Sequence, residues 1–155
     1  MIQRLQSVYL FLAFISGIIL FFVPIAWYYA DLYILEFFVC RVKDYTPANA
    51  PLFGSYFLLP LSLINLVSAL LSFVLIFMYK NLNRQYKLLR LNILLIIIHI
   101  GAIFYYSDKI GNTVQSKADF GIGAFLPLIS LVLLVLALRG INSDIKLLKS
   151  VDRLR

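Results

Sequence analysis

Residues 56–79 read YFLLPLSLINLVSALLSFVLIFMY, a run of 24 residues without a charged side chain. An α-helix needs about 17–25 residues to cross the ~30 Å hydrocarbon core of a bilayer, and this run has that length. Three further stretches, 8–29, 91–106 and 120–138, are similarly apolar and contain no Asp, Glu, Lys or Arg. The sequence therefore predicts an all-α membrane protein, with a bundle of four transmembrane helices over residues 1–140.

The composition argues against a soluble globule. Hydrophobic residues make up 63% of the 155 residues and charged residues 14%, so the apolar surface exceeds what a soluble domain of this size can hide. In hydrocarbon every backbone N–H and C=O must be paired internally. Because the apolar runs are long and do not alternate, they indicate helices and not the strands of a membrane barrel.

The basic residues predict an orientation for this bundle. Lys and Arg are enriched in the cytoplasmic segments of membrane proteins. Ten of the 14 basic residues lie in the N-terminal segment, the predicted loop 80–90 and the tail: Arg4, Lys80, Arg84, Lys87, Arg90, Arg139, Lys146, Lys149, Arg153 and Arg155. We therefore expect both termini and this loop in the cytoplasm. The net charge of +7 then needs no nucleic-acid partner.

The connection 31–54 is the longest segment outside the predicted helices, and it has strand character. Residues 32–35 and 37–39 are rich in aromatic and branched side chains, and Pro47 and Pro51 mark turns. We expect a short extracytoplasmic cap over the helix ends, with a β-hairpin as one form of it. Such a cap is either a receptor face or a lid that shields the helix ends.

Polar residues within the predicted helices are expected to pack helices together. The second helix carries four of them at spacings of three and four: Ser62, Asn65, Ser68 and Ser72. Asn92 and His99 are seven residues apart on the third helix, hence on one face. Because hydrocarbon penalises polar groups, we expect a neutral His99 that bonds to Asn65 or a serine. The alternative is a substrate path or a proton relay.

The C-terminal segment is predicted to be a separate helix. Gly140 is expected to end the fourth helix, and Pro127 to kink it. Residues 141–155 have one apolar face and are predicted to form a cytoplasmic amphipathic helix of the interfacial type. The side chains expected to contact a partner or anionic lipid are basic ones of the 80–90 loop and the tail: Arg84, Lys87, Arg90, Lys146, Lys149, Arg153 and Arg155.

The sequence contains no residue set that indicates catalysis. Cys40 is the single cysteine and His99 the single histidine. A dithiol redox pair within the chain and bis-histidine haem ligation are therefore excluded, and a zinc site lacks its three or four ligands. We expect no enzymatic activity, no cofactor and no metal.

Four segments carry a resemblance to a known family: 1–10 (MIQRLQSVYL), 84–95 (RQYKLLRLNILL), 123–129 (GAFLPLI) and 150–155 (SVDRLR). Together they resemble an uncharacterised family of small four-helix inner-membrane proteins from Bacteroidota, a domain-of-unknown-function family. The resemblance spans the whole chain. It implies a multi-pass protein of the bacterial cytoplasmic membrane and no particular activity.

These expectations favour a non-enzymatic accessory or scaffold subunit that binds a partner or anionic lipid through its basic cytoplasmic face and tail. The expected partners are membrane lipids and a membrane protein of unknown identity. The alternative is a small oligomeric transporter or channel that uses the polar stripe of the second helix and His99. Proton-coupled transporters usually need a membrane-embedded carboxylate, which the predicted spans lack.

Overall fold

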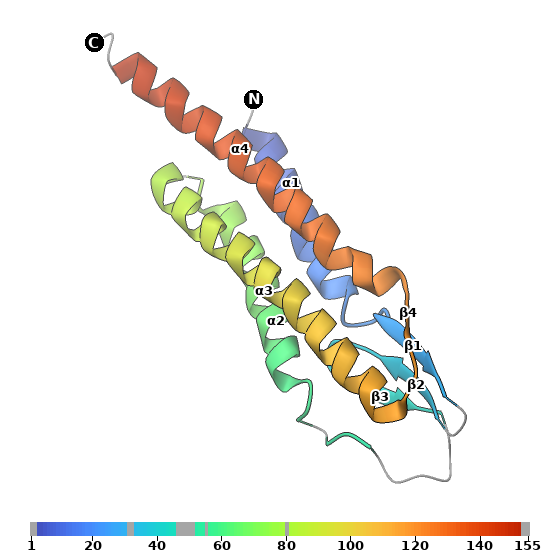
Figure 1. Cartoon of the computed structure of the whole chain (residues 1–155). Helices are drawn as coiled ribbons and strands as arrows, with labels where there is room; N and C mark the ends of the chain where they lie inside the picture. Colours follow the sequence, from blue (N-terminus) through green and yellow to red (C-terminus); the bar gives the residue numbers. More distant parts are fainter. Residues whose placement is uncertain (1–2, 31–32, 46–51, 55, 80, 153–155) are drawn as a thin grey trace.

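The computed structural model describes residues 3–30, 33–45, 52–54, 56–79 and 81–152 of the chain. Within them lie the α-helices α1 (Gln3–Ile19), α2 (Leu59–Phe77), α3 (Leu82–Val114) and α4 (Leu126–Asp152), and the short 3-10 helix η1 (Ile122–Phe125). The strands β1 (Ala26–Tyr29), β2 (Ile34–Phe37), β3 (Val42–Asp44) and β4 (Ala118–Phe120) form one small antiparallel sheet. The molecule is elongated, with the helices alongside one another and the sheet at one end (Figure 1).

The four α-helices each pack against two neighbours. α1 contacts α2 and α4, and α3 contacts the same two helices. Buried leucines from all four helices fill the space between them: Leu10, Leu75, Leu89 and Leu134. The N-terminal end of α1, the α2–α3 connection and the C-terminal end of α4 lie at the end of the molecule opposite the sheet (Figure 1).

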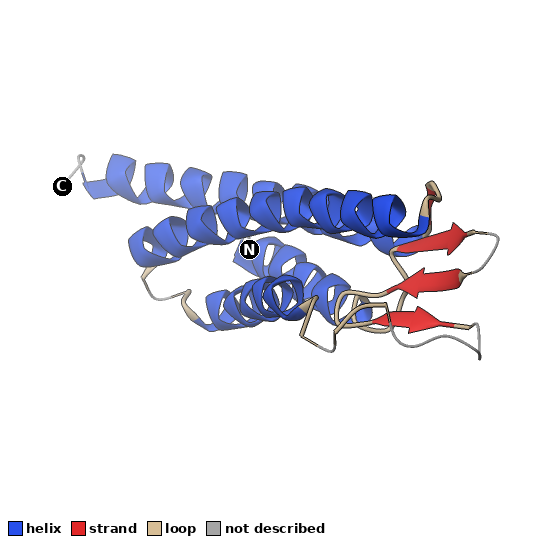
Figure 2. Ribbon diagram, turned by 60° about the horizontal axis from the view of Figure 1, so that its bottom comes forward, coloured by secondary structure: helices blue, strands red, loops and turns tan. Residues whose placement is uncertain are grey.

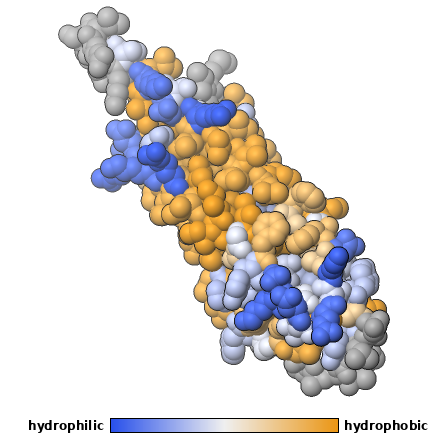
Figure 3. Space-filling view, in the orientation of Figure 1, coloured by the Kyte–Doolittle hydropathy of each residue, from blue (hydrophilic) through white to orange (hydrophobic). Residues whose placement is uncertain are grey.

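The surface of the helices is that of a membrane-associated protein. In the described part of the chain, three helical segments are long and apolar enough to cross a membrane: 59–77, 82–114 and 122–148. The apolar part of α1, Leu5–Ile19, is shorter and spans only about 22 Å at 1.5 Å per residue. On the face shown in Figure 3, apolar side chains cover the middle of the molecule, and hydrophilic ones gather towards its two ends.

The first apolar stretch does not form a single helix. α1 ends at Ile19 and residues 26–29 form β1, so the predicted transmembrane helix 8–29 is wrong over its last ten residues. Pro24 lies between the two elements, and proline lacks the N–H of a helix interior and disfavours helical conformation in the residue before it. The next N–H, that of Ile25, donates to the carbonyl of Phe37 at 2.7 Å. The chain therefore enters the sheet here.

The sheet has the strand order β3-β2-β1-β4 (Figure 2). β2 and β3, both within the 31–54 connection, pair antiparallel with Leu35 opposite Asp44, so a hairpin forms in this segment. β1 lies between β2 and β4. It pairs with β4 with Ala26 opposite Phe120. This pairing joins the segment after α1 to the segment before α4.

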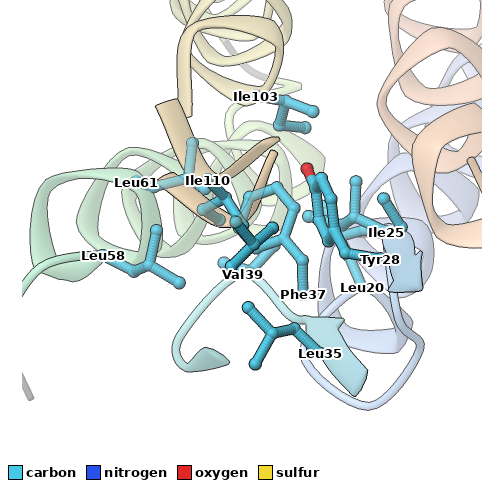
Figure 4. Close-up of a cluster of buried hydrophobic side chains, with 12 residues drawn as sticks. Leu20, Ile25, Tyr28, Leu35, Phe37, Val39, Leu58, Leu61, Ile103 and Ile110 are labelled. Atoms are coloured by element: carbon cyan, nitrogen blue, oxygen red, sulfur yellow. The ribbon is translucent and has the colours of Figure 1, made fainter. Parts of the chain in front are cut away.

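One face of the sheet packs against the helices. Tyr28 of β1 and Phe37 of β2 are fully buried there, against Ile103 and Ile110 of α3 and Leu61 of α2 (Figure 4). The sheet is therefore fixed to α2 and α3 by a common apolar core.

α3 extends beyond both ends of the predicted helix 91–106. It begins at Leu82, so the predicted 80–90 loop is helical from that residue, and it continues to Val114. Gln85 and Leu89 are buried on the same face as Asn92. The core-facing pattern of α3 thus continues through the basic stretch, and this is why no loop forms there.

α4 also differs from the predicted helix 120–138. Pro127 is its second residue, where a missing N–H costs no helical bond. The kink predicted at Pro127 requires an interior position, so this prediction is wrong. Gly140 does not end α4, which continues to Asp152. A Cβ at Gly140 would lie 2.8 Å from Cγ of Gln6, so this glycine allows α1 and α4 to approach closely. The predicted helix end at Gly140 is wrong.

Candidate functional site

A buried polar layer joins α2 to α3. Ser68 Oγ donates to Asn92 Oδ1 at 2.7 Å, and Asn92 Nδ2 donates to Ser72 Oγ at 2.8 Å. Ser72 Oγ in turn donates to the carbonyl of Ser68 at 3.0 Å. All three side chains are buried. The structure therefore brings three of the predicted packing residues together, and the Asn92 amide uses both its oxygen and its nitrogen.

Asn65 connects α2 to α1. Its Nδ2 donates to the carbonyl of Gly17 at 2.9 Å. The two helices approach so closely that a Cβ at Gly17 would lie 3.0 Å from Cβ of Ala69. Ser62, the remaining residue of the predicted stripe, is half-buried and donates to the carbonyl of Leu59 at 2.9 Å. The bond described for Ser62 therefore lies within its own helix.

His99 is completely buried on α3. Neither ring nitrogen has a hydrogen-bond partner in the part of the chain that the structure describes. The predicted bond to Asn65 or a serine is therefore wrong. The amide of Asn65 and the hydroxyls of Ser68 and Ser72 are bonded elsewhere.

The buried face of α3 alternates between polar and apolar residues. Its polar members are Gln85, Asn92, His99 and Ser107, and the apolar residues between them are Leu89, Ile96 and Ile103. Each polar layer is thus separated from the next by an apolar one. The polar groups along this face act as individual layers and not as one continuous path.

Exposed basic residues gather at the end of the molecule opposite the sheet. Arg84, Lys87 and Arg90 are exposed on the first turns of α3, and Lys146 is exposed near the end of α4. The guanidinium of Arg90 lies 5.2 Å from the ring centre of Tyr86. This end of the molecule is hydrophilic in the space-filling view (Figure 3).

The other basic residues that were predicted to contact a partner or lipid are not placed by the structure. The side chain of Lys149 and the whole of Arg153 and Arg155 lie outside the described residues.

A buried carboxylate at this end was missed by the sequence analysis. Gln6 Nε2 donates to Asp144 Oδ2 at 2.7 Å, and both side chains are buried. In the amphipathic helix predicted for residues 141–155, an aspartate is expected outside the apolar face, whereas the structure turns Asp144 towards α1. The signal that could have revealed it is its spacing of three residues from Ile141, which is also buried.

A second buried pair fixes the sheet to α3. The Tyr28 hydroxyl lies 2.7 Å from Ser107 Oγ and donates to the Ser107 carbonyl at 3.0 Å. Burial raises the pKa of the Tyr28 hydroxyl, the bond to Ser107 lowers it, and the nearby Asp108 charge raises it, with a net upward shift. Tyr28 therefore stays protonated at neutral pH and can donate.

A protein-family model, Domain of unknown function (DUF4293), matches residues 2–154. The chain belongs to the DUF4293 family. The predicted resemblance to a domain-of-unknown-function family is thereby confirmed. A comparison with curated proteins finds no match.

Membership of DUF4293 assigns no activity, so the chemistry must be argued from the residues. In the described ranges, no group of three or more His, Cys, Asp and Glu side chains is placed to hold a metal ion. What this DUF4293 chain offers is a set of hydrogen-bonded layers between helices, a basic end and a sheet at the opposite end. These features suit packing and surface contact.

Proposed function

We propose that this DUF4293 protein is an integral inner-membrane protein that serves, without chemistry of its own, as an accessory or scaffold subunit. All four α-helices run between the basic end and the sheet end (Figure 1), so we place all four across the bilayer, with the sheet on the outer side and the basic end in the cytoplasm. The observation that carries this proposal is the exposed basic group of Arg84, Lys87, Arg90 and Lys146 at one end of an apolar molecule. Such an excess of basic residues is typical of cytoplasmic ends.

The contrast with the sheet end supports this orientation. There the described basic and acidic residues balance one another: Arg41, Lys43, Lys109 and Lys117 against Glu36, Asp44, Asp108 and Asp119. At the opposite end Asp144 is buried against Gln6, so it offers little negative surface. Each exposed basic residue near an anionic membrane surface contributes about 1 kcal/mol to attraction.

The end of α4 supports a contact role. α4 has 27 residues and is about 40 Å long, which exceeds the ~30 Å hydrocarbon core. Its last turns carry Leu147 and Leu148, which are 56% and 57% exposed, next to the exposed Lys146. A projecting helix with adjacent apolar and basic side chains fits a partner protein or an anionic headgroup layer. Removal of residues 146–155 is the experiment that tests this role, with loss of partner co-purification as the expected result.

The proposed orientation predicts the accessibility of Cys40. This single cysteine is exposed at the sheet end, so a membrane-impermeant maleimide should label it in intact cells. A Cys40→Ala, Asn81→Cys variant moves the thiol to the exposed position between α2 and α3, where labelling should require permeabilised cells. The reverse pattern would contradict the orientation.

A second candidate function is transport, and the buried His99 favours it. A polar group buried without a hydrogen-bond partner lowers stability by about 1–3 kcal/mol. A residue with such a cost is expected to have a functional role that offsets it. Intramembrane ionisable residues commonly mark transport pathways.

The role of His99 can be tested with His99→Leu. Because the leucine removes the unpartnered nitrogens, we expect thermal unfolding in detergent to shift towards higher stability, by about 1 kcal/mol. Proteoliposomes with a pH-sensitive dye supply the functional readout. Proton flux in the wild type that a stable His99→Leu protein loses would favour transport, and no flux above empty vesicles would remove this candidate. A marked loss of stability would contradict the unpartnered state of His99.

A further inference from the structure

A pocket of about 500 Å³ opens between the end of α3 and β4. One wall is α3 itself, which contributes Asp108 and Asn112, and the other wall is the turn that contains Gln115 and Lys117. The Tyr28–Ser107 pair lies at its inner side, since Ser107 is both a lining residue and the partner of Tyr28. The pocket is therefore formed where the sheet, α3 and the α3–β4 turn meet.

The turn that forms one wall is held in a fixed conformation. Gln115 adopts a left-handed conformation with φ 54°, and the Ser116 N–H donates to the carbonyl of Gly111 at 3.1 Å. A Cβ at Gly111 would lie 2.8 Å from the Ser116 carbonyl oxygen, so only glycine permits this close turn. Ser116 Oγ also donates to the carbonyl of Tyr29 at 2.7 Å. A preformed wall of this kind lowers the entropic cost of binding.

The pocket carries two opposite charges that do not pair with each other. Asp108 Oδ2 accepts a bond from Asn112 Nδ2 at 3.0 Å, which leaves the other carboxylate oxygen available. Within the described residues Lys117 forms no ion pair or side-chain hydrogen bond, and neither does the Gln115 side chain. A molecule with its own positive and negative groups can therefore lie between Asp108 and Lys117.

The rim of the pocket is apolar on the side that faces the middle of the molecule. Phe104 and Phe120 line it and meet edge to face, with ring centres 5.7 Å apart. They are 56% and 41% exposed, and Phe104 lies one helical turn from Asp108 towards the apolar middle of α3. Exposed apolar rings next to charged groups suit the border between the acyl chains and the headgroups of a membrane.

We propose that this pocket binds the headgroup of a zwitterionic phospholipid with a primary ammonium group, such as phosphatidylethanolamine. The ammonium donates to Asp108, the phosphate accepts from Lys117 and Gln115, and the acyl chains run over Phe104 and Phe120. A primary ammonium forms charge-assisted hydrogen bonds with a carboxylate, whereas the trimethylammonium of phosphatidylcholine has no N–H. A purely anionic headgroup would be repelled by Asp108. This inference rests on the proposed membrane placement.

Native mass spectrometry of the full chain in detergent, with added lipids, tests the proposal. Phosphatidylethanolamine should bind at least about fivefold more tightly than phosphatidylcholine or phosphatidylglycerol, a difference of about 1 kcal/mol. Asp108→Asn and Lys117→Gln should each weaken phosphatidylethanolamine binding about three- to tenfold. The matched control is Asp119→Asn, an exposed carboxylate on β4 outside the pocket lining, which should leave binding unchanged.

The outcomes test separately whether the pocket recognises the ethanolamine headgroup, whether the ligand must be a lipid, and whether the protein is integrated in the membrane. Equal binding of the ethanolamine and choline lipids, or an equal effect of Asp108→Asn and Asp119→Asn, would overturn the proposal. Equally tight binding of soluble glycerophosphoethanolamine would overturn the lipid source, because the acyl chains would then add nothing. Alkaline extraction of membranes reports on membrane integration independently. A chain that stays in the membrane without headgroup preference therefore refutes only this site.

Discussion

Replacing Gly123 with alanine is expected to destabilise the protein by about 3 kcal/mol or more. Gly123 lies in η1, and its N–H donates to the carbonyl of Pro24 at 3.2 Å. A Cβ here would overlap the Pro24 carbonyl oxygen and lie 2.8 Å from the carbonyl carbon and 3.1 Å from Cα of Ile25. Backbone atoms cannot rotate away as a side chain can, so the segment before β1 or the start of α4 must move. Thermal unfolding in detergent measures the loss.

The matched control for this variant is Gly101→Ala. Gly101 lies in α3, and no neighbouring atom lies within 4 Å of the position that an alanine methyl group would take. Alanine should therefore stabilise the protein slightly, by about 0.5–1 kcal/mol, because it loses less conformational entropy in a helix. Equal stability of Gly123→Ala and the wild type would contradict the close packing of η1 on Pro24.

The mostly helical fold could be predicted from composition and run length. The helix predicted at 56–79 is observed as α2 from Leu59 to Phe77, because nothing in this run competes with a helix: its proline falls in the first turn. The ends of α3 and α4 could not be found in this way. The basic residues 80–90 predict a loop, but Gln85 and Leu89 continue the buried face of α3.

The sheet was the least predictable part of the fold. A short apolar strand and a segment of apolar helix have the same composition, so composition predicts a helix for residues 26–29. Their strand conformation depends on pairing with other segments: Trp27 lies opposite Glu36 of the next strand on one side and opposite Asp119, far along the chain, on the other. No local pattern in residues 26–29 encodes the β4 partner.

The buried polar groups were predictable as a set but not as bonds. Spacing placed Ser68, Ser72 and Asn92 on inward faces, and the structure joins them. Spacing could not show that the Asn65 amide would donate to a carbonyl of α1. Because it does, Asn65 does not pair with His99, whose ring nitrogens have no partner in the described part of the chain. The contact between Gln6 and Asp144 depends on how α1 and α4 align along their lengths, and one sequence does not reveal this alignment.

Two truncations of α4, after Gly140 and after Ile145, separate its contribution to stability from its contribution to partner binding. Ending the chain after Gly140 removes Ile141, which is fully buried in the core with Leu10 and Leu134. It also removes Asp144 and leaves Gln6 unpaired in the interior. We expect a loss of about 3–5 kcal/mol in unfolding free energy, from a large buried aliphatic side chain and a buried hydrogen bond. A tail that was separable at Gly140 would cause no such loss in thermal unfolding.

Ending the chain after Ile145 is expected to preserve stability and abolish partner binding. This variant keeps Ile141, Asp144 and the partly buried Ile145, so its thermal unfolding should match the wild type. It lacks the exposed 146–148 segment and the basic residues beyond it, and partner proteins should therefore fall to background in mild-detergent purification with quantitative mass spectrometry. The full-length control carries Lys146→Gln, Leu147→Ser and Leu148→Ser, and should lose the same partners because those side chains supply the contact. If both variants retained every partner of the wild type, the projecting end of α4 would have no contact role and the accessory-subunit proposal would lose its support.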